Sequence, residues 1–385
     1  MGPEAPYRRA WQATSNDPES NFTNWPVVDD GVVFARSAGG LLAVNGKDGS
    51  RLWFVDGGGS RQVAPALSST AVFLPLGSRQ MVALDRVTGD ELWAFESGRG
   101  GDLDPSPTLS GDTLVFSLPD DRAIYALDSA SGEVRWKLET DLSPDYVPAI
   151  SGNLLVVPTE EVGTPRVLVL ALNAATGEEA WRADQLESAS SVSIADGKVF
   201  FGGGDLFAHA LDLKTGEEIW RSPVEDKFDP WNMPALAFGD VFLADRVGNI
   251  YRLDGETGRR EWIFTETEGT MDQSFPVIAG QTLFIGSGAG FLYAIDTETG
   301  RLLWQDRVRG IVQSGAADEE RFYFGVKLGA DEGLHAYEHD PEGELAAPPG
   351  RDLGPLGSLV GGLVLFLLLF TGVILYVRRK RASAE

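Results

Sequence analysis

Histidine and cysteine, two residue types that often carry catalysis or hold metals, are scarce or absent in this chain of 385 residues. The histidines are His209, His335 and His339, and none of them lies in a metal-ligand pattern. Cysteine is absent, which excludes a disulfide framework, a thiolate metal site and a cysteine nucleophile. No Gly-x-Ser-x-Gly, phosphate-loop or zincin motif is present. The sequence therefore predicts no metal centre and no catalytic residues.

Aromatic and acidic residues between the repeated segments are better candidates for binding. Trp25 and Trp231 each precede a segment that we expect to lie innermost in the fold, near one mouth of a central channel. Aromatic rings and carboxylates around a concave mouth can hold a ligand, a partner peptide, or a quinone with its cation. The candidate site consists of Trp25, Asp229, Trp231, Asn232 and Asp272, with Asp102, Asp104, Asp145 and Gln313 expected near the same mouth. The alternative is that these residues fill gaps in the packing and solvate the rim.

One short phrase is repeated along the chain and must position these residues. In its clearest copy an apolar pair leads into Asp296, Gly300 follows four residues later, and Trp304 follows after four more. The other copies are Asn45/Gly49/Trp53, Asp85/Gly89/Trp93, Asp128/Gly132/Trp136, Asn173/Gly177/Trp181, Asp212/Gly216/Trp220 and Asp254/Gly258/Trp262. Successive tryptophans lie 39 to 45 residues apart, which is the length of one four-stranded propeller blade.

The phrase has the composition of a β-hairpin. Alternating apolar residues such as Leu292 and Ala294 predict a half-buried strand. The Asp or Asn side chain can accept hydrogen bonds from the tight turn that it opens, and the glycine supplies a positive φ without steric cost. The second strand carries the tryptophan, whose large apolar surface suits the gap between adjacent blades. We therefore predict a β-propeller.

Fragments at the two ends of the repeats predict how the ring closes. Trp11 lies 42 residues before Trp53, in register with the series, but no turn precedes it. Residues 321–326 and 333–338 have the pattern of two strands of a further blade that lacks a tryptophan. If the N-terminal strand completes that last blade, no open sheet edge is left between the two ends of the array. We predict an all-β, eight-bladed propeller over residues 1–340, with seven blades as the alternative.

Two further details concern the blades. Short segments that end in proline precede several hairpins and are expected to be the innermost strands; the prolines are Pro26, Pro65, Pro107, Pro148, Pro234 and Pro276. Residues 160–166 lengthen one hairpin and account for the longest interval between tryptophans. Insertions in exposed loops are usually neutral, and a contact loop is the alternative.

The C-terminal part of the chain has a different composition. Residues 341–352 resemble a linker. Residues 353–377 carry no charge, and about 20 apolar residues suffice to span a bilayer as a helix. The basic cluster Arg378–Arg381 follows at once in a short tail, residues 378–385. We predict a single-pass helix in the plasma membrane, with the tail in the cytoplasm and the propeller outside it, by the positive-inside rule.

The route to that location has alternatives. Residues 1–10 lack the apolar region of a signal peptide. Either an upstream signal was removed, or the protein is tail-anchored with its propeller in the cytoplasm, and the clustered bases favour the first. A sorting signal for wall anchoring ranks lower, because no Leu-Pro-x-Thr-Gly sequence precedes the apolar run.

The charge of the chain restricts its partners. Asp and Glu number 57 against 32 Lys and Arg, a formal net charge of −25. Such a surface repels phosphate backbones, so nucleic acid is excluded as a partner. Solubility explains the excess of acids most simply, and recognition of cationic partners is the second explanation.

The repeated phrase resembles the tryptophan-docking motif of the PQQ-like, or quinoprotein-type, β-propeller repeat family. The threonine of that motif is present at Thr88, Thr176, Thr215, Thr257 and Thr299. The resemblance covers about residues 8–340 and implies the fold, but it does not imply one activity. The family includes PQQ-dependent alcohol and glucose dehydrogenases, and also the non-enzymatic BamB-type outer-membrane assembly lipoprotein.

The chain departs from both branches of the family. The alcohol dehydrogenases are larger, with a vicinal Cys-Cys disulfide over the quinone and Glu, Asn and Asp around calcium, and no such set aligns here. The assembly lipoprotein is closer in size and blade number, but this chain lacks a lipidated cysteine. A helical span also implies a plasma-type membrane rather than an outer one.

We therefore expect a BamB-like, membrane-anchored propeller that binds other membrane or envelope proteins as a scaffold or accessory subunit. We expect no catalysis and no cofactor. The alternatives are a dehydrogenase that uses PQQ with calcium, and a ligand sensor, for which the four residues after the basic cluster leave little to signal with.

Overall fold

The computed structural model describes most of the chain before residue 344. The described residues are 5–14, 25–37, 39–57, 63–76, 79–97, 106–119, 121–144, 146–161, 164, 167–186, 189–226, 228, 232–265, 267–271 and 274–343. They contain no helix of the length and apolar character that a membrane crossing requires. The predicted transmembrane helix, residues 353–377, and the basic tail lie outside the described residues.

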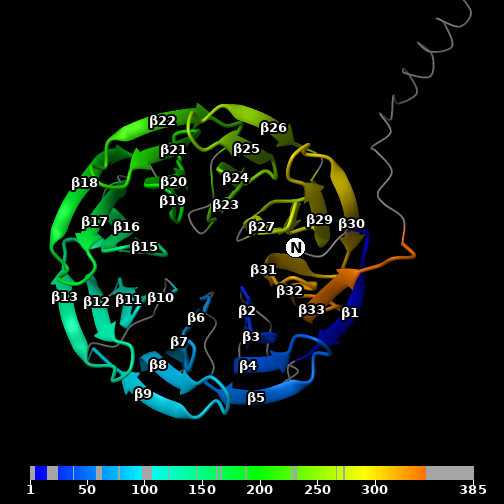
Figure 1. Ribbon diagram of the computed structural model, residues 1–385, viewed down its shortest axis with the longest axis horizontal. Helices are drawn as coiled ribbons and strands as arrows, with labels where there is room; N and C mark the ends of the chain where they lie inside the picture. Colours follow the sequence, from blue (N-terminus) through cyan, green and yellow to red (C-terminus); the bar gives the residue numbers. More distant parts are fainter. Residues whose placement is uncertain are drawn as a thin grey trace, which may run out of the picture. The chain divides into compact units, whose positions relative to one another are not determined.

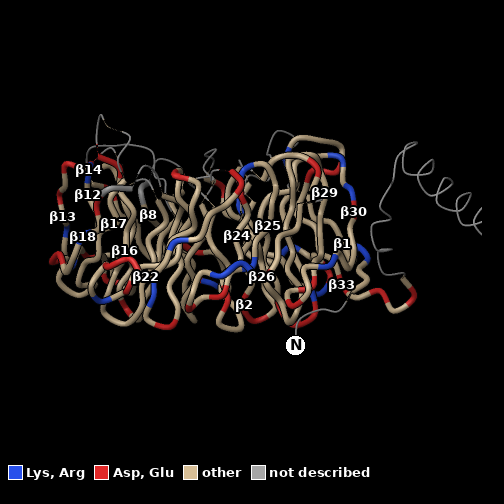
Figure 2. Tube along the Cα trace, turned by 90° about the horizontal axis from the view of Figure 1, so that it is seen from above, with Lys and Arg blue, Asp and Glu red and all other residues tan. Residues whose placement is uncertain are grey.

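The described strands form eight antiparallel sheets arranged in a ring (Figure 1). Within each blade the strands lie side by side, ordered from the centre of the ring to its rim, and the outermost strand forms the outer wall. The prediction of an all-β, eight-bladed propeller is confirmed, and the seven-bladed alternative is wrong. Acidic residues, red in Figure 2, occur along both faces of the ring.

The strands of the first four blades follow the chain in order. They are β2 (Val27–Asp29), β3 (Val32–Ser37), β4 (Gly40–Asn45) and β5 (Arg51–Asp56); β6 (Ala66–Leu67), β7 (Ala71–Leu76), β8 (Arg79–Asp85) and β9 (Glu91–Phe95); β10 (Thr108–Ser110), β11 (Thr113–Leu118), β12 (Ala123–Asp128) and β13 (Val134–Glu139); β14 (Leu142–Ser143), β15 (Ala149–Ser151), β16 (Leu154–Glu161), β17 (Val167–Asn173) and β18 (Glu179–Leu186). The fourth blade gains a fifth strand, because the hairpin that residues 160–166 lengthen also pairs with β14.

The remaining blades repeat the same order until the last one. They are β19 (Ser193–Ala195), β20 (Lys198–Gly202), β21 (Phe207–Asp212) and β22 (Glu218–Pro223); β23 (Ala235–Ala237), β24 (Asp240–Ala244), β25 (Ile250–Asp254) and β26 (Arg260–Phe264); β27 (Val277–Ala279), β28 (Thr282–Gly286), β29 (Phe291–Asp296) and β30 (Leu302–Arg307); β31 (Ile311–Ala317), β32 (Arg321–Lys327), β33 (Gly333–His339) and β1 (Tyr7–Ala13). Strand β1 pairs with β33, so the N-terminal strand closes the ring as predicted.

The repeated phrase forms the hairpin that its composition predicts. The carboxylate of Asp85 accepts hydrogen bonds from the backbone N–H groups of Val87 and Thr88, at 2.9 and 2.8 Å, and these bonds hold the pKa of Asp85 below its ordinary value. Gly89 closes the turn by donating to the Asp85 carbonyl, with φ at +79°. A β-bulge then shifts the register of β9 on β8 and directs Trp93 toward the next blade.

Each tryptophan of the series, from Trp11 to Trp262, docks on the turn of the following blade. The Trp53 ring lies on Gly89, where an added Cβ would come 2.9 Å from two ring atoms, and its Nε1 donates to the Arg86 carbonyl at 3.1 Å. Trp11 makes the same pair of contacts with Gly49 and Gly46, which confirms it as the tryptophan of the last blade. Glycine is required at these turns both for its positive φ and for the close approach of the indole.

Eight apolar clusters fill the eight interfaces between blades. At the closing interface Val33 and Val44 of the first blade pack on Tyr323 and Leu334 of the eighth, with Trp11 beside them. The other clusters join successive blades in the same way. The core is therefore distributed around the ring, as expected for stacked repeats that bury a face only against their neighbours.

One detail of the sequence interpretation is wrong. The inner strands do not end in the marked prolines: each strand begins directly after its proline, as β2 follows Pro26 and β23 follows Pro234. A proline has no N–H to donate to a sheet ladder, and it is tolerated where a strand starts. The prolines therefore mark the entry of the chain into each blade.

Candidate functional site

The structure describes two of the five residues predicted to bind a ligand at the channel mouth. Trp25 is 3% exposed, and its ring meets Phe275 edge-on at 4.9 Å, which links the entry to the first blade with the entry to the seventh. Asn232 is also 3% exposed. Its Nδ2 donates to the carbonyls of Ala244 and Met271, at 3.3 and 3.2 Å. Both side chains serve the packing of the blades.

The other three predicted residues, Asp229, Trp231 and Asp272, lie outside the described residues, as do Asp102, Asp104 and Asp145. Gln313 is described on β31, where it is 1% exposed and its amide group has no hydrogen-bond partner among the described residues. A ligand site at the channel mouth therefore stays a prediction.

Two of the histidines occupy equivalent positions in the fifth and eighth blades. The ring of His209 lies between two carboxylates, with Nδ1 3.0 Å from Glu218 and Nε2 3.1 Å from Asp205. The Nε2 of His335 lies 2.6 Å from the Asp331 carbonyl, and burial lowers the pKa of its imidazole. Each ring stacks on a neighbouring phenylalanine, which fits a structural role. Among the residues described, no three His, Asp or Glu side chains are grouped to hold a metal.

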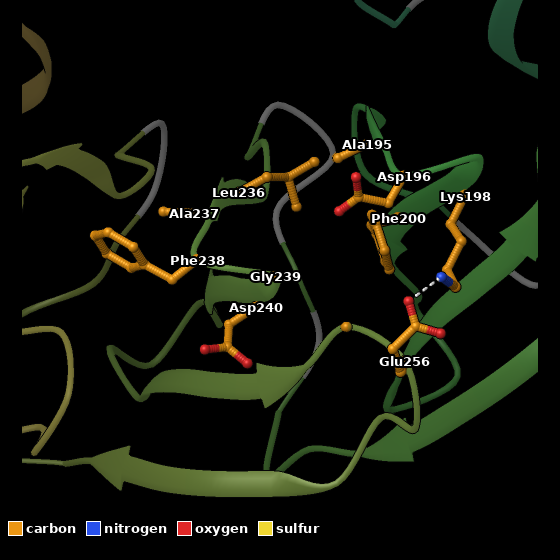
Figure 3. A pocket seen from close by; sticks show the side chains of 11 residues that line it. Ala195, Asp196, Lys198, Phe200, Leu236, Ala237, Phe238, Gly239, Asp240 and Glu256 are labelled. Carbon is orange, nitrogen blue, oxygen red and sulfur yellow. Dashed lines mark hydrogen bonds and ion pairs between the residues drawn. The ribbon is translucent and has the colours of Figure 1, made fainter.

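One face of the ring carries the first hairpin turn of each blade and, in the first seven blades, the third hairpin turn as well; we call it the turn face. Between the fifth and sixth blades this face is hollowed by a pocket of about 170 Å³ (Figure 3). The pocket is lined by buried Phe200 and by an ion pair of 2.6 Å between Lys198 and Glu256. The two blades meet there through that ion pair and through a hydrogen bond of 3.1 Å from the Trp220 Nε1 to the Gly255 carbonyl.

Phe238 forms the rim of this pocket and is the most unusual residue of the turn face. It is 62% exposed and has φ at +58°, a left-handed conformation that costs a bulky side chain roughly 1–2 kcal/mol. It is the first residue of the turn between β23 and β24. The corresponding left-handed residue is Asp or Gly in five other blades: Asp30, Gly111, Gly152, Asp196 and Gly280. In Figure 3 the Phe238 ring lies on the far side of its turn from Asp196 and Phe200.

A second pocket lies on the other side of Phe238, between the sixth and seventh blades. It encloses about 200 Å³ and is lined by Phe238, Arg252, Gln281, Thr297 and Glu298. The Arg252 guanidinium is already engaged, because it pairs with Asp240 at 2.7 Å and donates to two carbonyls of the seventh blade. Phe238 thus stands as a ridge between two pockets.

We call Phe238 with Asp196, Glu256 and Glu298 the Phe238 ridge. All four side chains are exposed. The two cations beside them, Lys198 and Arg252, are paired with Glu256 and Asp240. Within the described part of the chain, Asp196 and Glu298 have no cationic partner. The ridge therefore presents an apolar ring between unneutralised carboxylates, which is suited to contact with another molecule and not to bond-breaking chemistry.

A wider hollow of about 480 Å³ lies on the same face at the closing interface. It is lined mainly by polar residues, including Asp30, Lys47, Asp318 and Glu320. Tyr323 lies at its base, donates to the Asp318 carboxylate at 2.8 Å and approaches the Gly46 carbonyl at 3.3 Å. Burial, with the adjacent Asp318, raises the pKa of the Tyr323 hydroxyl. Because Tyr323 and Gly46 belong to the eighth and first blades, this contact joins the two blades that close the ring.

Sequence reasoning missed the Phe238 ridge. A signal was present: the chain reads Phe-Gly at 238–239, where two equivalent turns read Asp-Gly at 30–31 and 196–197. That signal becomes visible only after the turns are aligned blade by blade.

Comparison with known proteins assigns the repeats to a family. The model of the family described as outer membrane protein assembly factor BamB matches residues 8–96, 79–229 and 165–322. The chain is 32% identical over 192 residues to the outer membrane protein assembly factor BamB of Nitrosomonas eutropha. That alignment covers 42% of each protein. The chain is 29% identical over 188 residues to the serine/threonine-protein kinase AfsK of Streptomyces griseus, which covers 45% of this chain and 22% of the kinase. These matches span less than half the length of the curated relatives.

Solved structures share the fold at low sequence identity. BamB from Moraxella catarrhalis aligns with a TM-score of 0.67 at 15% identity, over 86% of this chain and 100% of that one. A europium-containing methanol dehydrogenase aligns with a TM-score of 0.67 at 13% identity, over 86% of this chain and 93% of that one. At these identities the likeness shows the propeller alone.

Proposed function

Because the chain belongs to the family described as outer membrane protein assembly factor BamB, we propose that it is a protein-binding scaffold or accessory subunit of a membrane or envelope complex, without catalysis of its own. The observation that carries the proposal is the Phe238 ridge, an exposed aromatic side chain between two pockets on a rigid ring. Aromatic anchors beside pockets are typical of protein interfaces, where a few such residues supply most of the binding energy.

The proposal includes an anchor in the plasma membrane. Residues 353–377 would cross the bilayer once, with the propeller outside the cytoplasm and the bases Arg378–Arg381 inside it; the uncharged run and the positive-inside rule support this topology. The absence of cysteine permits a direct test. A single cysteine at Ser69→Cys should react with an impermeant maleimide on intact cells, and one at Ser383→Cys should react only after lysis. The reverse pattern would place the propeller in the cytoplasm.

The central experiment is purification of the tagged full chain after mild cross-linking, in several gentle detergents. The proposal expects the same membrane or envelope proteins in stoichiometric amounts under each condition. Recovery of this chain alone under all conditions would contradict it. A deletion of residues 353–385 would serve as the control that separates partners held by the propeller from partners held by the anchor.

A dehydrogenase that uses PQQ with calcium is the second candidate, because a methanol dehydrogenase shares the fold. The described residues do not fit that site: no group of three Asp, Glu or His side chains is placed to hold a cation, and the chain has no cysteine for a vicinal disulfide. Calorimetry with PQQ in the presence of calcium, and separately of europium, should give no heat of binding. Tight binding together with dye reduction by an alcohol would replace the scaffold proposal.

A further inference from the structure

A left-handed backbone and high exposure occur together at Phe238, as they do at Leu328, but at Phe238 they coincide with a pocket on each side. Asn, Asp and Gly adopt the left-handed conformation of a two-residue hairpin easily, whereas phenylalanine does not. Phe238 is nevertheless found there with φ at +58°, and its side chain is 62% exposed rather than packed in the core. Backbone strain of this kind persists at functional positions, because the surrounding fold holds it in place.

The surroundings of the ridge indicate the chemistry of its partner. One pocket on each side of Phe238 can receive a side chain, and an extended segment directs successive side chains to opposite sides. Asp196 lines the first pocket and Glu298 the second, and neither is paired with a cation of the described residues. The nearby cations are already neutralised, Lys198 by Glu256 and Arg252 by Asp240. The empty partner positions therefore call for positive charge.

We propose that the Phe238 ridge binds an extended segment of a partner protein in which an apolar side chain is flanked by Lys or Arg. The apolar side chain packs on the Phe238 ring, and the flanking cations pair with Asp196 and Glu298. This inference rests on the proposed scaffold function and names the surface that performs it. A formal charge of −25 on the chain adds long-range attraction for a basic partner.

The same charges disfavour two other occupants of the ridge. An anionic lipid surface is repelled by the acids beside Phe238, although an exposed aromatic residue alone would suit a membrane interface. A second copy of the chain brings the same carboxylates to the contact, and like charges placed face to face oppose association. A basic protein segment is the occupant that satisfies both the ring and the acids.

The test uses the full chain in its own cells, with three variants of the ridge and one control variant. Phe238 replaced by the photo-reactive p-benzoylphenylalanine should cross-link to a segment that carries Lys or Arg within three residues of the reacted position. Phe238→Asn should lower the yield of that partner at least tenfold in the tagged purification. The double charge reversal Asp196→Lys with Glu298→Lys should lower it to a similar degree. Binding of the partner to the parent chain should also weaken as the salt concentration rises, because salt screens the pairing of the partner's cations with Asp196 and Glu298.

Leu328→Asn is the matched control. Leu328 is also an apolar residue with positive φ, at +56°, and is 60% exposed, but it follows β32 on the opposite face of the ring. Its replacement should leave the partner yield unchanged. Phe238→Asn should also leave the melting temperature unchanged or raise it by up to about 2 °C, because asparagine tolerates this conformation. Loss of binding without loss of stability is a result that a structural role for Phe238 cannot produce.

The outcomes separate this inference from the function on which it rests. If the parent chain and every variant purify alone, the scaffold function fails. If all variants retain the same partner at equal yield, the scaffold function stands and the ridge is not its docking surface. Cross-links from position 238 to lipid, to a second copy of this chain, or to an acidic segment would each overturn the inference.

Discussion

The interface between the seventh and eighth blades differs from the other seven interfaces around the ring. Elsewhere an indole lies on the glycine of the next hairpin and donates to a carbonyl there. The Trp93 ring, for example, lies on Gly132, and its Nε1 donates to the Ser129 carbonyl. Trp304 instead meets two tyrosines edge-on, Tyr7 at 5.5 Å and Tyr337 at 5.3 Å. In the described structure its Nε1 has no carbonyl partner.

The reason for the difference is that the eighth blade is built from both ends of the repeats. Its outer strands are β33 and β1, which belong to distant parts of the chain, so no hairpin turn joins them. Without that turn there is no positive-φ glycine for Trp304 to cover. The tryptophan–glycine dock therefore depends on a continuous hairpin, and where the chain is interrupted an aromatic cluster replaces it.

The largest effect should come from removing the closing strand. Deletion of residues 1–14 removes Tyr7 and Trp11 and exposes the edge of β33, so we expect loss of the cooperative melting transition and aggregation, measured by circular dichroism and size-exclusion chromatography. A circular permutant that begins at residue 25 and carries residues 5–14 after residue 343 restores the strand and should melt near the temperature of the parent. A deletion mutant that melts like the parent would show that the ring does not need β1.

The second largest effect should come from disturbing one tryptophan–glycine contact, in a blade whose outer strands are joined by a hairpin. Gly132→Ala places a Cβ within 2.7 Å of the Trp93 ring at φ +73°, and we expect a cost of about 2–4 kcal/mol in the free energy of unfolding. Gly152→Ala is the control, since its φ is +59° but nothing lies within 4 Å of the added atom. Denaturant titration should give a clearly smaller loss for the control. Equal losses would mean that the dock adds nothing beyond the glycine conformation.

A subtler comparison replaces the tryptophans themselves. Trp53→Phe leaves the Arg86 carbonyl without its donor, whereas Trp304→Phe removes no such hydrogen bond. We expect Trp53→Phe to cost about 1–2 kcal/mol more than Trp304→Phe in the free energy of unfolding. Chemical denaturation of both variants measures the difference directly. The opposite order would indicate that the aromatic cluster of the closing blade depends on the indole more than the docks do.

The smallest effect concerns histidines in corresponding positions of the fifth and eighth blades. Burial depresses the pKa of His335, so the folded state takes up its proton less readily than the unfolded chain does. The stabilisation is complete above the unfolded pKa of about 6.5 and is lost as the pH falls below it. His335→Gln should therefore flatten the fall in melting temperature between pH 7.5 and 5.

His209→Gln in the fifth blade is the control for that measurement. The His209 ring lies between two carboxylates, Asp205 and Glu218, rather than against a carbonyl. His209→Gln removes an imidazole from the equivalent position of another blade, so it controls for the substitution itself. If His335→Gln has the same profile as the parent, burial of the imidazole contributes no measurable pH dependence.

The hairpins and the ring closure could be predicted because their signals are local or periodic. Asp85, Gly89 and Trp93 belong to one hairpin, and their spacing reports its turn wherever it recurs. The register of Trp11 with Trp53 indicated the closing strand in the same way. The inner strands were misplaced by a few residues, because proline marks a boundary without stating on which side of it the strand lies.

The candidate surface could not be predicted with the same reasoning. Phe238 and Asp196 are corresponding residues of two adjacent blades, but Glu298 lies in a different turn of a third blade, and nothing in the repeat pattern groups the three. The charge of this surface also depends on whether the neighbouring cations are already paired. Only the structure shows that Lys198 pairs with Glu256 and Arg252 with Asp240. The first pairing joins two neighbouring blades, and the second joins two strands of the sixth blade.

The amino-acid sequence by itself determined the blade, its repeat number and the way in which the ring is closed, because each follows from hairpin chemistry repeated at a regular interval. Only the tertiary structure decided what the ring presents to a partner. The pockets beside Phe238 form where separate blades meet, and the net charge of that surface is what remains after ion pairs within and between blades have neutralised part of it.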